Sequence, residues 1–291
     1  MKRFLAAAIV LAGCDAPTPT STEPTGPLVS QAQPVQDGQP DLVGVPDLIV
    51  RGDMLGGQWV VRDETFDASY CSVVEGGVNP GDHRVVRFTV GTANIGDADM
   101  FIGSPLAHYN ANDGLYELST CHNHFHFRHY ALYELIGPDG HVWKAAKRGF
   151  CMLDTDPNPA WLGTPPRSGL FHNCGTLTLD GYQGVSVGWT DTYRFYLGGQ
   201  YFVLDGGDGQ PVVPEGDYVL RITVNPPFVA RRGEACPHVD SLGFCHQLPE
   251  SNYANNAAQI TLHIPEHPGR SGYGPLGGSD NKNTEIDPCA D

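Results

Sequence analysis

The sequence predicts an all-β fold: a β-sandwich-like single domain with long irregular loops. Three segments alternate apolar and polar residues with a period of two, which is typical of strands that bury one face; they are 83–90, 216–224 and 257–264. Helical periodicity is weak throughout the chain. Turn-forming sequences such as DGGDGQP (205–211) and PEGD (214–217) separate the expected strands. With 291 residues, the chain is long enough to bury a substantial core.

Residues 1–13 have the form of an export signal. A basic start is followed by an apolar stretch over residues 4–12, which is too short to span a bilayer core of about 30 Å. The sequence LAGC then resembles a bacterial lipobox, in which the chain is cut before the cysteine and the new N-terminal cysteine, here Cys14, is acylated. The alternative is an ordinary secretory signal with a chance cysteine. Acylation of Cys14 would give an exported protein, lipid-anchored to a membrane of the cell envelope on the periplasmic side or at the cell surface.

Two segments of biased composition flank the predicted folded unit, 46–264. Residues 14–45 are rich in Pro, Thr, Ser, Gln and Gly and include no aromatic residue. Such a segment cannot bury enough apolar surface to fold, so it is expected to form a disordered linker after the lipid-anchored cysteine. Residues 265–291 are rich in Gly, Pro and Asn and are expected to form a tail, which a disulfide from Cys289 would attach to the body.

The chain is strongly acidic, with 33 Asp and Glu against 17 Lys and Arg and a formal net charge of -16. A polyanion repels nucleic acid, which argues against nucleic acid as a partner, and it attracts cations. Two interpretations stay open: the charge only maintains solubility, or it attracts basic proteins, peptides or polyamines.

Cysteine usage gives a second set of expectations. Removing Cys14 from the eight cysteines leaves an odd number, so at least one thiol is unpaired or bonded outside the chain. The sequence has no C-x-x-C pair, which argues against zinc ribbons and thioredoxin-like redox motifs. Cys236 and Cys245 flank a short loop and form the easiest local pair to propose.

Residues 121–130, CHNHFHFRHY, contain four histidines, three of them at two-residue spacing. If 121–127 is extended, these three project from one face of the strand: His122, His124 and His126. Phe125 and Phe127 project from the other face and can anchor the strand in the core. Same-face side chains lie about 6.5–7 Å apart along a strand, so the imidazoles can converge on one ion. Three nitrogen ligands with an open position fit Cu(II) or Zn(II) in a catalytic site.

The remaining histidine, His129, breaks the alternation. We expect it to support a ligating histidine by a hydrogen bond, to act as a base or to be uninvolved, rather than to bind the ion. For the triplet itself, two alternatives to a functional site stay open: a surface strand that is merely rich in histidine, and an adventitious metal chelator.

The run TCHNHFHFRHYALYEL resembles the copper-binding segment of the lysyl oxidase family, in which a Cys-His-x-His-x-His string is followed shortly by His-Tyr. Further blocks are similar to this family and occur in its order over about residues 46–264: PDLIV, ASYC, DHRVVRF, KRGFCMLDTD, WTDTY, GDYVLRITVNPPF and ESNYANN. The resemblance implies that the three histidines bind Cu(2+). It also implies a lysine tyrosylquinone, a covalent adduct of a lysine and an oxidised tyrosine, which maps onto Lys147 and Tyr193.

The cysteine framework is only partly that of the family. The resemblance implies a disulfide between Cys121 and Cys174. The family's second cysteine shortly after the Phe-Cys pair is absent, which leaves Cys151 without its usual partner, and a tryptophan stands near where another family cysteine is expected. The pairings that stay open are those of Cys71, Cys151 and Cys289.

The chemistry of such a cofactor constrains the site. Oxidation by copper and O₂ beside the ring can turn a tyrosine into a quinone that a neutral lysine amine attacks, so copper, Lys147 and Tyr193 must lie within contact distance. Lys147 must also be deprotonated, which burial or a neighbouring cation such as Arg148 or Cu(II) would promote.

Asp191 is the candidate catalytic base. On a strand, its two-residue spacing from Tyr193 would put both side chains on one face. The alternative is a carboxylate that stabilises a turn or caps a helix. His129 is the rival base, although FRHY is shorter than the family's corresponding stretch, so His129 is matched only with a gap.

The resemblance thus implies a protein-lysine 6-oxidase-like copper amine oxidase. Such an enzyme uses O₂ to oxidise primary amines, lysyl side chains or small amines, to aldehydes with release of ammonia and hydrogen peroxide. The alternative from a different class is a non-catalytic copper-binding envelope lipoprotein in which Lys147 and Tyr193 are unmodified. A third interpretation is a zinc hydrolase on the same three ligands, for which no Glu or Asp is obviously placed to activate water.

Overall fold

The computed structural model describes residue 40 and residues 42–147, 149–158, 167–231 and 235–278. The predicted signal (1–13), Cys14, Arg148 and Cys289 lie outside the described residues, as does most of the predicted linker, 14–45. Within the described ranges, no helix is both long enough and apolar enough to cross a membrane.

Three sheets of three or four strands make up most of the fold, and their strands pair antiparallel. The first has the order β1 (Leu48–Val50), β4 (Val90–Asn94), β12 (Trp189–Tyr193) and β10 (Asp156–Pro157). The second has the order β13 (Tyr201–Val203), β3 (Gly81–Phe88) and β2 (Trp59–Phe66). The third has the order β17 (Ala257–Ile264), β14 (Gly216–Val224), β8 (Ala131–Ile136) and β9 (Val142–Lys144).

Shorter elements accompany these sheets. Two-stranded sheets are formed by β5 (Met100–Gly103) with β11 (Gln183–Val185), by β6 (Tyr116–Ser119) with β7 (His124–Phe127), and by β15 (His238–Val239) with β16 (Cys245–His246). The helices are short: α1 (Gly52–Gly57), α2 (Cys71–Val74), α3 (Pro105–Ala111) and the 3-10 helix η1 (Tyr253–Asn255). This shortness agrees with the weak helical periodicity of the sequence.

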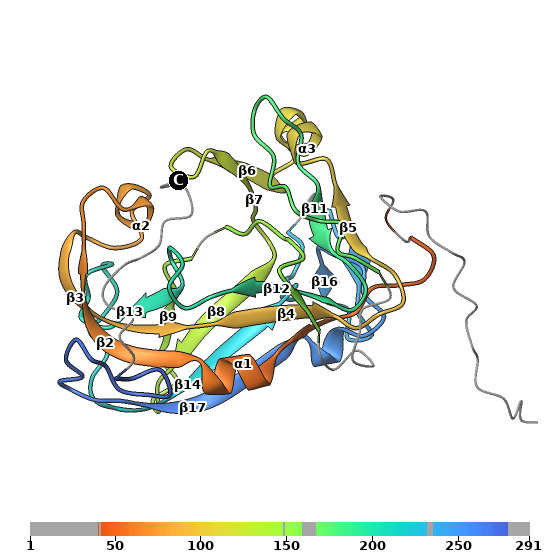
Figure 1. The fold of residues 1–291 in the computed structure, drawn as a ribbon. Coiled ribbons are helices and arrows are strands. Elements are labelled where there is room, and N and C mark those ends of the chain that lie inside the picture. Colours follow the sequence, from red (N-terminus) through yellow and green to blue (C-terminus); the bar gives the residue numbers. More distant parts are fainter. Residues whose placement is uncertain (1–39, 41, 148, 159–166, 232–234, 279–291) are drawn as a thin grey trace, which may run out of the picture. The chain divides into compact units, whose positions relative to one another are not determined.

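The sheets form two packed layers (Figure 1). The first two sheets run into each other, because only Thr89 separates β3 from β4. The third sheet packs against them: Phe88 on β3 contacts Tyr133 on β8, with 5.4 Å between ring centroids, and residues of all three sheets share one core cluster. Burial of facing apolar surfaces is the main favourable contribution to folding. The predicted all-β, sandwich-like fold is confirmed.

Two of the three predicted strands match the structure closely. Residues 216–224 form β14, in which four alternating residues are buried and the three between them are half-buried; the buried ones are Tyr218, Leu220, Ile222 and Val224. Residues 257–264 form β17, which pairs with β14 along its whole length.

The third predicted strand, 83–90, differs. It is interrupted at Thr89 and continues as β4. Its last residues are buried on both faces, with Val86 in the main core and Val85 in a second, smaller cluster. The polar positions of the alternating pattern therefore did not mark a solvent face here: Arg87 is 0% exposed.

Arg87 is buried with its own counter-ion. Its Nη2 and Nε atoms lie 2.5 and 2.8 Å from the two carboxylate oxygens of Glu64 on β2, and its guanidinium lies 4.8 Å from the ring centroid of Tyr201. Its Nη1 donates to two backbone oxygens of the 195–197 segment. Burial alone would raise the pKa of Glu64, but the charges and hydrogen bonds of Arg87 and Arg62 outweigh burial and lower it.

The described chain continues past Ile264, where the sequence placed the end of the folded unit. Tyr273 and Val61 exchange two backbone hydrogen bonds of 2.8 Å, and the ring of Tyr273 lies 6.1 Å from that of Trp59. A glycine permits this approach, because a Cβ on Gly272 would lie 2.5 Å from a β2 side chain. The first part of the predicted tail, up to residue 278, therefore packs along β2.

Three disulfides are present in the described residues: Cys71–Cys121, Cys151–Cys174 and Cys236–Cys245. The local pair that the sequence favoured, Cys236 with Cys245, is confirmed, and the pair implied by resemblance, Cys121 with Cys174, is wrong. A turn before β7 carries Cys121 to the first residue of α2, Cys71, so that Cys174 bonds to Cys151 instead. Several disulfides in one chain are typical of a protein that folds outside the reducing cytosol.

Candidate functional site

β7 carries two of the three histidines, and a turn carries the third. The chain is extended only from His124 onward. Residues 121–123 form a turn in which Asn123 has a φ of 52°, a left-handed conformation that asparagine tolerates better than most residues. The expectation of an extended 121–127 segment is therefore wrong for its first three residues. The expected anchoring is confirmed, because both phenylalanines of β7 are 0% exposed.

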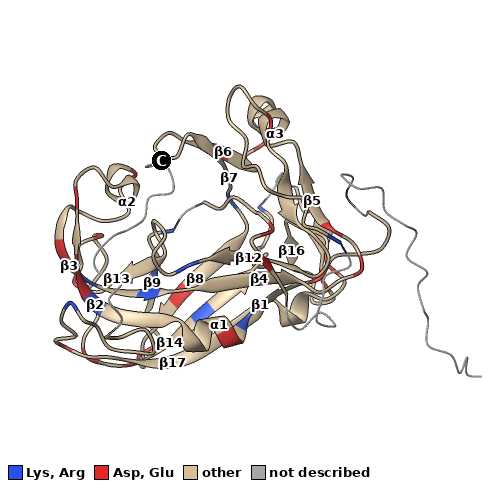
Figure 2. Ribbon diagram, viewed as in Figure 1, with Lys and Arg blue, Asp and Glu red and all other residues tan. Residues whose placement is uncertain are grey.

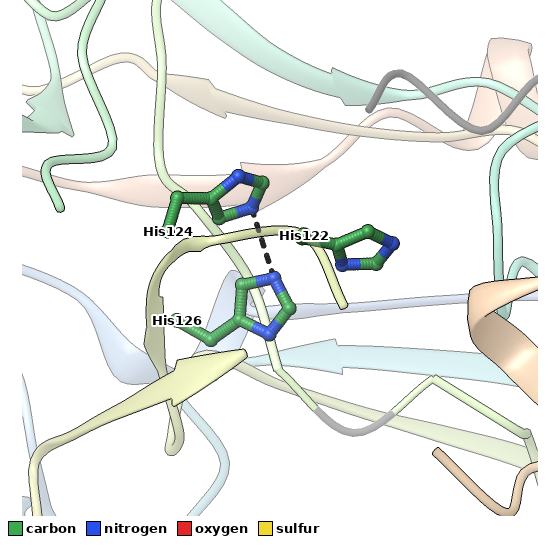
Figure 3. A group of neighbouring side chains, drawn as sticks. All are labelled: His122, His124 and His126. Atoms are coloured by element: carbon green, nitrogen blue, oxygen red, sulfur yellow. Dashed lines mark hydrogen bonds between the residues drawn. The ribbon is translucent and has the colours of Figure 1, made fainter. Parts of the chain in front are cut away.

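The turn nevertheless brings the three imidazoles together (Figure 3). One ring nitrogen from each of His122, His124 and His126 lies within 4.8 Å of the others. The Nε2 atoms of His124 and His126 are 3.1 Å apart. The backbone N–H of His122 donates to Ser119 Oγ at 3.0 Å, which fixes the turn against β6.

Electrostatics keep the most buried histidine neutral. Burial lowers the pKa of His126 to about 2, and the charges of Lys147, His124 and His122 act in the same direction. A neutral imidazole offers a nitrogen lone pair, which is the form that binds a metal ion. The three donors therefore fit Cu(II) or Zn(II) with at least one coordination position open.

The segment that follows β9 runs beside β7. Phe127 donates its backbone N–H to Phe150 at 2.6 Å and accepts one in return at 3.2 Å. Gly149 makes this approach possible, because a Cβ there would lie 2.6 Å from His126 Cβ. The pairing brings Lys147, three residues before Phe150, to the histidines.

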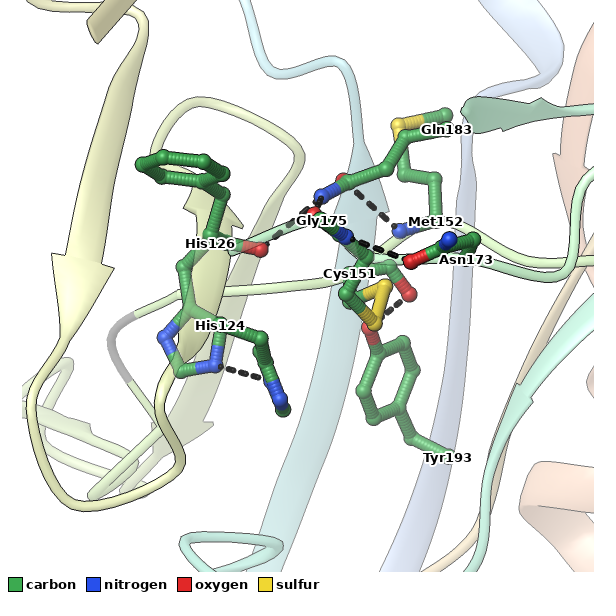
Figure 4. Close-up of a disulfide and its surroundings, with 10 residues drawn as sticks. His124, His126, Cys151, Met152, Asn173, Gly175, Gln183 and Tyr193 are labelled. Carbon is green, nitrogen blue, oxygen red and sulfur yellow. Dashed lines mark hydrogen bonds between the residues drawn. A yellow bond between two sulfur atoms is a disulfide. The ribbon is translucent and has the colours of Figure 1, made fainter. Parts of the chain in front are cut away.

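Lys147 points at Tyr193 on β12. Its Nζ atom lies 4.4 Å from the ring centroid of Tyr193 and 5.2 Å from that of Phe150. The Tyr193 hydroxyl donates to the backbone oxygen of Cys151 at 2.7 Å, which fixes the ring (Figure 4). Gly199 leaves room for Lys147, because a Cβ there would lie 3.1 Å from Lys147 Cα. The amine and the phenol are thus in contact although they are far apart in the sequence.

A buried glutamine joins three segments of the site (Figure 4). The side-chain amide of Gln183, 0% exposed, donates to the backbone oxygens of Phe125 and Cys174 at 2.8 and 2.9 Å. Its oxygen accepts from the Met152 N–H at 3.2 Å. Together with the Cys151–Cys174 disulfide, these bonds hold the strand of the histidines against the segment that faces Tyr193.

A cavity of about 210 Å³ joins these groups. The predicted site residues that line it are His122, His124, His126, Lys147, Asp191 and Tyr193. Asp191 and Tyr193 share this cavity, as their spacing on one strand predicts. His129 does not line it. That residue is exposed and borders a separate cavity of about 520 Å³ beside Phe228 and Val229.

Asp191 is 2% exposed. Burial raises the pKa of its carboxyl well above the usual range, and a backbone hydrogen bond from Leu153, the Tyr130 hydroxyl and the charge of Lys147 oppose that shift. Its Oδ2 makes no hydrogen bond of regular geometry to another residue in the described part of the chain. A raised pKa lets a carboxylate exchange a proton nearer to neutral pH, as a general base requires.

A second cavity, of about 310 Å³, shares His122, His126 and Lys147 with the first. It is also lined by Glu75, which follows α2, and by Glu117 on β6. Ser119 Oγ donates to Glu75 Oε1 at 2.5 Å and holds that carboxylate. Figure 2 shows acidic residues on the ribbon near α2 and along β3. A positively charged group that approaches the histidines from this side therefore meets the Glu75 carboxylate and that of Glu117, which Arg128 partly neutralises at 3.4 Å.

Sequence reasoning missed two residues that shape the site. Phe150 contacts both Lys147 and Tyr193, and Tyr130 lies beside Asp191. Both belong to sequence blocks that carry the resemblance, KRGFC and FRHY. Nothing in their type or spacing distinguishes them from ordinary core aromatic residues.

Comparison with known protein families agrees with this geometry. The sequence profile of the lysyl oxidase family matches residues 65–234, a range that includes every residue lining the first cavity. No curated protein sequence matches the chain. The matched range is more than half of the 291 residues, and the chain therefore belongs to the lysyl oxidase family.

Proposed function

We propose that the protein is a copper-dependent amine oxidase that converts primary amines, lysyl side chains or small amines, to aldehydes with release of ammonia and hydrogen peroxide. One observation carries the proposal: Lys147 Nζ lies 4.4 Å from the ring centroid of Tyr193 in a cavity that three histidines also line. Family membership supports oxidation of an amine by O₂.

His122, His124 and His126 are the residues that would hold copper. One ring nitrogen from each lies within 4.8 Å of the others. An all-imidazole ligand set suits Cu(II), whereas Mg²⁺ and Ca²⁺ prefer oxygen ligands. The ion would be needed to oxidise the tyrosine ring when the organic cofactor forms. The same ligands accept zinc, so the donor set alone does not separate an oxidase from a zinc hydrolase.

Lys147 and Tyr193 are the residues that would form a lysine tyrosylquinone. Tyr193 is 9% exposed and its ring is held by the hydrogen bond to Cys151, so one ring face is presented to the lysine amine. Once formed, this cofactor supplies an electron sink for removal of a proton from the carbon next to the substrate nitrogen. Lys144, in contrast, forms an ion pair with Glu134 at 2.9 Å and does not line the cavity that contains Tyr193.

Asp191 is the base that we assign to this proton transfer. It lies on the same strand as Tyr193, two residues away, and lines the same cavity. Burial next to apolar neighbours such as Leu153 and Leu197 limits access of water and strengthens its interaction with a bound ammonium group. His129, the rival base, borders another cavity.

The substrate that we propose is a basic protein, a peptide or a polyamine. The net charge of -16 and the carboxylates of Glu75 and Glu117 at the second cavity support a cationic amine. Rates of peroxide release should fall as salt is added, because screening weakens such attraction. Rates that do not depend on salt would contradict this electrostatic attraction and would mean that contacts inside the cavity select the amine.

Export and a lipid anchor at Cys14 belong to the same proposal. The sequence LAGC and the disulfides support it, although Cys14 itself lies outside the described residues. Cys14→Ser should move the protein from the membrane fraction to the soluble fraction. Equal membrane association of both proteins would contradict the anchor.

Peptide mass spectrometry of protein matured with copper and O₂ tests the cofactor. The peptides that contain Lys147 and Tyr193 should appear as one covalently joined species. Protein prepared with zinc in place of copper, and the Tyr193→Phe variant, should yield two separate peptides. Separate peptides from the copper-matured wild type would instead support a copper-binding protein without amine oxidase chemistry.

A further inference from the structure

Three phenol rings pack around the ring of Phe150. Tyr130, Tyr133 and Tyr193 meet it edge-on, with ring centroids 5.3, 5.6 and 5.3 Å away and interplanar angles of 75°, 74° and 89°. The proposed function uses Tyr193 and leaves the other two without a role. Because Tyr130 and Tyr133 are only 1% and 4% exposed, their hydroxyl groups are buried polar groups that require an explanation.

The Tyr130 hydroxyl lies beside two side chains of neighbouring strands. Asp191 on β12 and Thr92 on β4 are direct partners in the strand register, a position that brings Cβ atoms to about 5 Å. Tyr130 interacts with both. Burial raises the pKa of Tyr130 well above its usual range, and its contact with Thr92 opposes that shift. Contact with Tyr130 likewise opposes the rise that burial causes in the pKa of Asp191.

Both ends of the contact between Tyr130 and Asp191 have unused hydrogen-bonding capacity. The Tyr130 hydroxyl and Asp191 Oδ2 are buried, and neither makes a hydrogen bond of regular geometry to another described residue. A buried polar group without a partner is costly, and a hydrogen bond to an ionised carboxylate is among the stronger ones. A small rotation of the phenol that completes this bond is therefore favoured.

We propose that Tyr130 is a positioning residue for Asp191: its hydroxyl donates to the carboxylate, holds it in a fixed orientation at the cavity and favours the ionised form that can accept a proton. This inference rests on the proposed role of Asp191 as the base. Tyr130 does not line the cavity itself, so it acts through Asp191.

The charged surroundings of Asp191 explain why a donor is needed. The titratable groups that face it are Tyr130, Tyr133, Tyr193, Lys147 and Asp154. Burial favours the protonated form most strongly and Asp154 adds to that effect, whereas Lys147 opposes it. If Lys147 becomes part of the cofactor, its positive charge no longer contributes. The hydrogen bond from Tyr130 then becomes a larger part of what keeps Asp191 ionised.

Titration of the Asp191 carboxyl in the metal-free protein tests the inference without any enzymatic reaction. Infrared difference spectra between pH values report the protonated carboxyl, and the band that disappears in Asp191→Asn identifies this residue. Tyr130→Phe removes the donor and keeps the ring on Phe150. In this variant, the pH midpoint of the Asp191 carboxyl titration should lie about one pH unit or more above that of the wild type.

Tyr133→Phe is the matched control. It removes a similarly buried hydroxyl from the same ring cluster, and the polar side chain next to that hydroxyl is Gln200. This variant should keep the wild-type midpoint. Equal midpoints in the wild type and Tyr130→Phe, or equal shifts in both variants, would overturn the proposal.

The copper-matured enzyme provides a second readout. Because the reaction needs ionised Asp191, the acidic limb of the kcat profile should move to higher pH in Tyr130→Phe by the same amount as the infrared midpoint, with little change in KM. If the wild type shows no amine oxidase activity, the proposed function fails, and the infrared titration still decides the role of Tyr130.

Should Tyr130→Phe not fold, Thr92→Val replaces it. A shift in the same direction supports the proposal, and an unchanged midpoint overturns it.

Discussion

Lys147 Nζ lies 4.4 Å from the ring centroid of Tyr193. Two strand pairings that are remote in sequence create this contact. The first is the pairing of Phe127 with Phe150, which brings the lysine segment beside β7. The second is the pairing of β12 with β4, which places Tyr193 within the first sheet. These two pairings place the amine next to the ring, as formation of the proposed cofactor requires.

Replacement of Lys147 should abolish the cofactor while leaving the fold intact. Phenylhydrazine should form a coloured adduct with copper-matured wild type, and amine-dependent peroxide release should accompany it. Lys147→Met should show neither, because no amine remains to bond with the oxidised ring. Lys144→Met is the matched control, because Lys144 is exposed and paired with Glu134; it should keep both signals. Loss of both signals in the control would show that the effect is not specific to position 147.

Removal of one imidazole from the triad should release copper. His126→Ala should retain about a tenth or less of the wild-type copper after dialysis, measured by metal analysis, because a two-histidine remnant binds weakly at neutral pH. His129→Ala should keep the full amount, since His129 borders a different cavity. A comparable loss of copper from the His129 variant would mean that the ion binds elsewhere.

Arg87 should be a main contributor to stability. Arg87→Met leaves the carboxylate of Glu64 buried at 1% exposure with Arg62 as its remaining charged partner, so the free energy of unfolding should fall by about 3 kcal/mol. Arg270→Met removes an exposed partner of Asp82, at 56% and 70% side-chain exposure, and should cost at most about 1 kcal/mol. Urea unfolding of both metal-free variants measures the difference, and equal losses would contradict the assignment.

Glu250 should make stability depend on pH. Burial raises its pKa from 4.5 to about 7, although hydrogen bonds from Asn225, Asn256 and the Leu48 N–H oppose the shift. Between these two values the folded state keeps the proton and the unfolded chain releases it. The contribution of Glu250 to the free energy of unfolding therefore falls as pH rises, by up to about 1.4 kcal/mol per pH unit.

The variant Glu250→Gln cannot titrate at this position. Its free energy of unfolding should accordingly decline less steeply than that of the wild type between about pH 5 and pH 7. The constant cost of replacing a carboxylate that accepts three hydrogen bonds shifts the whole curve and does not affect its slope. Parallel curves for the two proteins would show that Glu250 is already ionised in the folded state across this range.

The features that were predicted correctly from sequence are those set by local pattern. β14 and β17 follow from strict alternation, because each has one face on the core and one face partly in water. The histidine triplet was found because its spacing is itself the signal. The alternating pattern of residues 83–90 did not indicate that Arg87 is buried. The presence of a second layer on that side, with Glu64 as a partner, depends on the three-dimensional packing of β2 and β3.

The features that sequence could not predict depend on backbone conformation at single residues. The left-handed Asn123 delays the start of the strand to His124, and the turn before it brings Cys121 to α2. Cys121 therefore bonds to Cys71, and Cys174 bonds to Cys151, which differs from the pairing that family resemblance implied. Burial of Asp191 and its contact with Tyr130 likewise depend on the tertiary arrangement around β12, which pairs with β4, and no local pattern reports them.

The disulfide between Cys71 and Cys121 places a covalent cross-link directly next to His122 in the chain. Without this disulfide, the turn that presents the imidazole would lose its covalent constraint while the hydrogen bond to Ser119 stays available, so the three histidines would be less well preorganised. If the three histidines hold copper as proposed, oxidation of these thiols should come before efficient uptake of the ion. In a chain that is exported as proposed, the adjacency of one sulfur and one imidazole would then link metal uptake to departure from the reducing compartment.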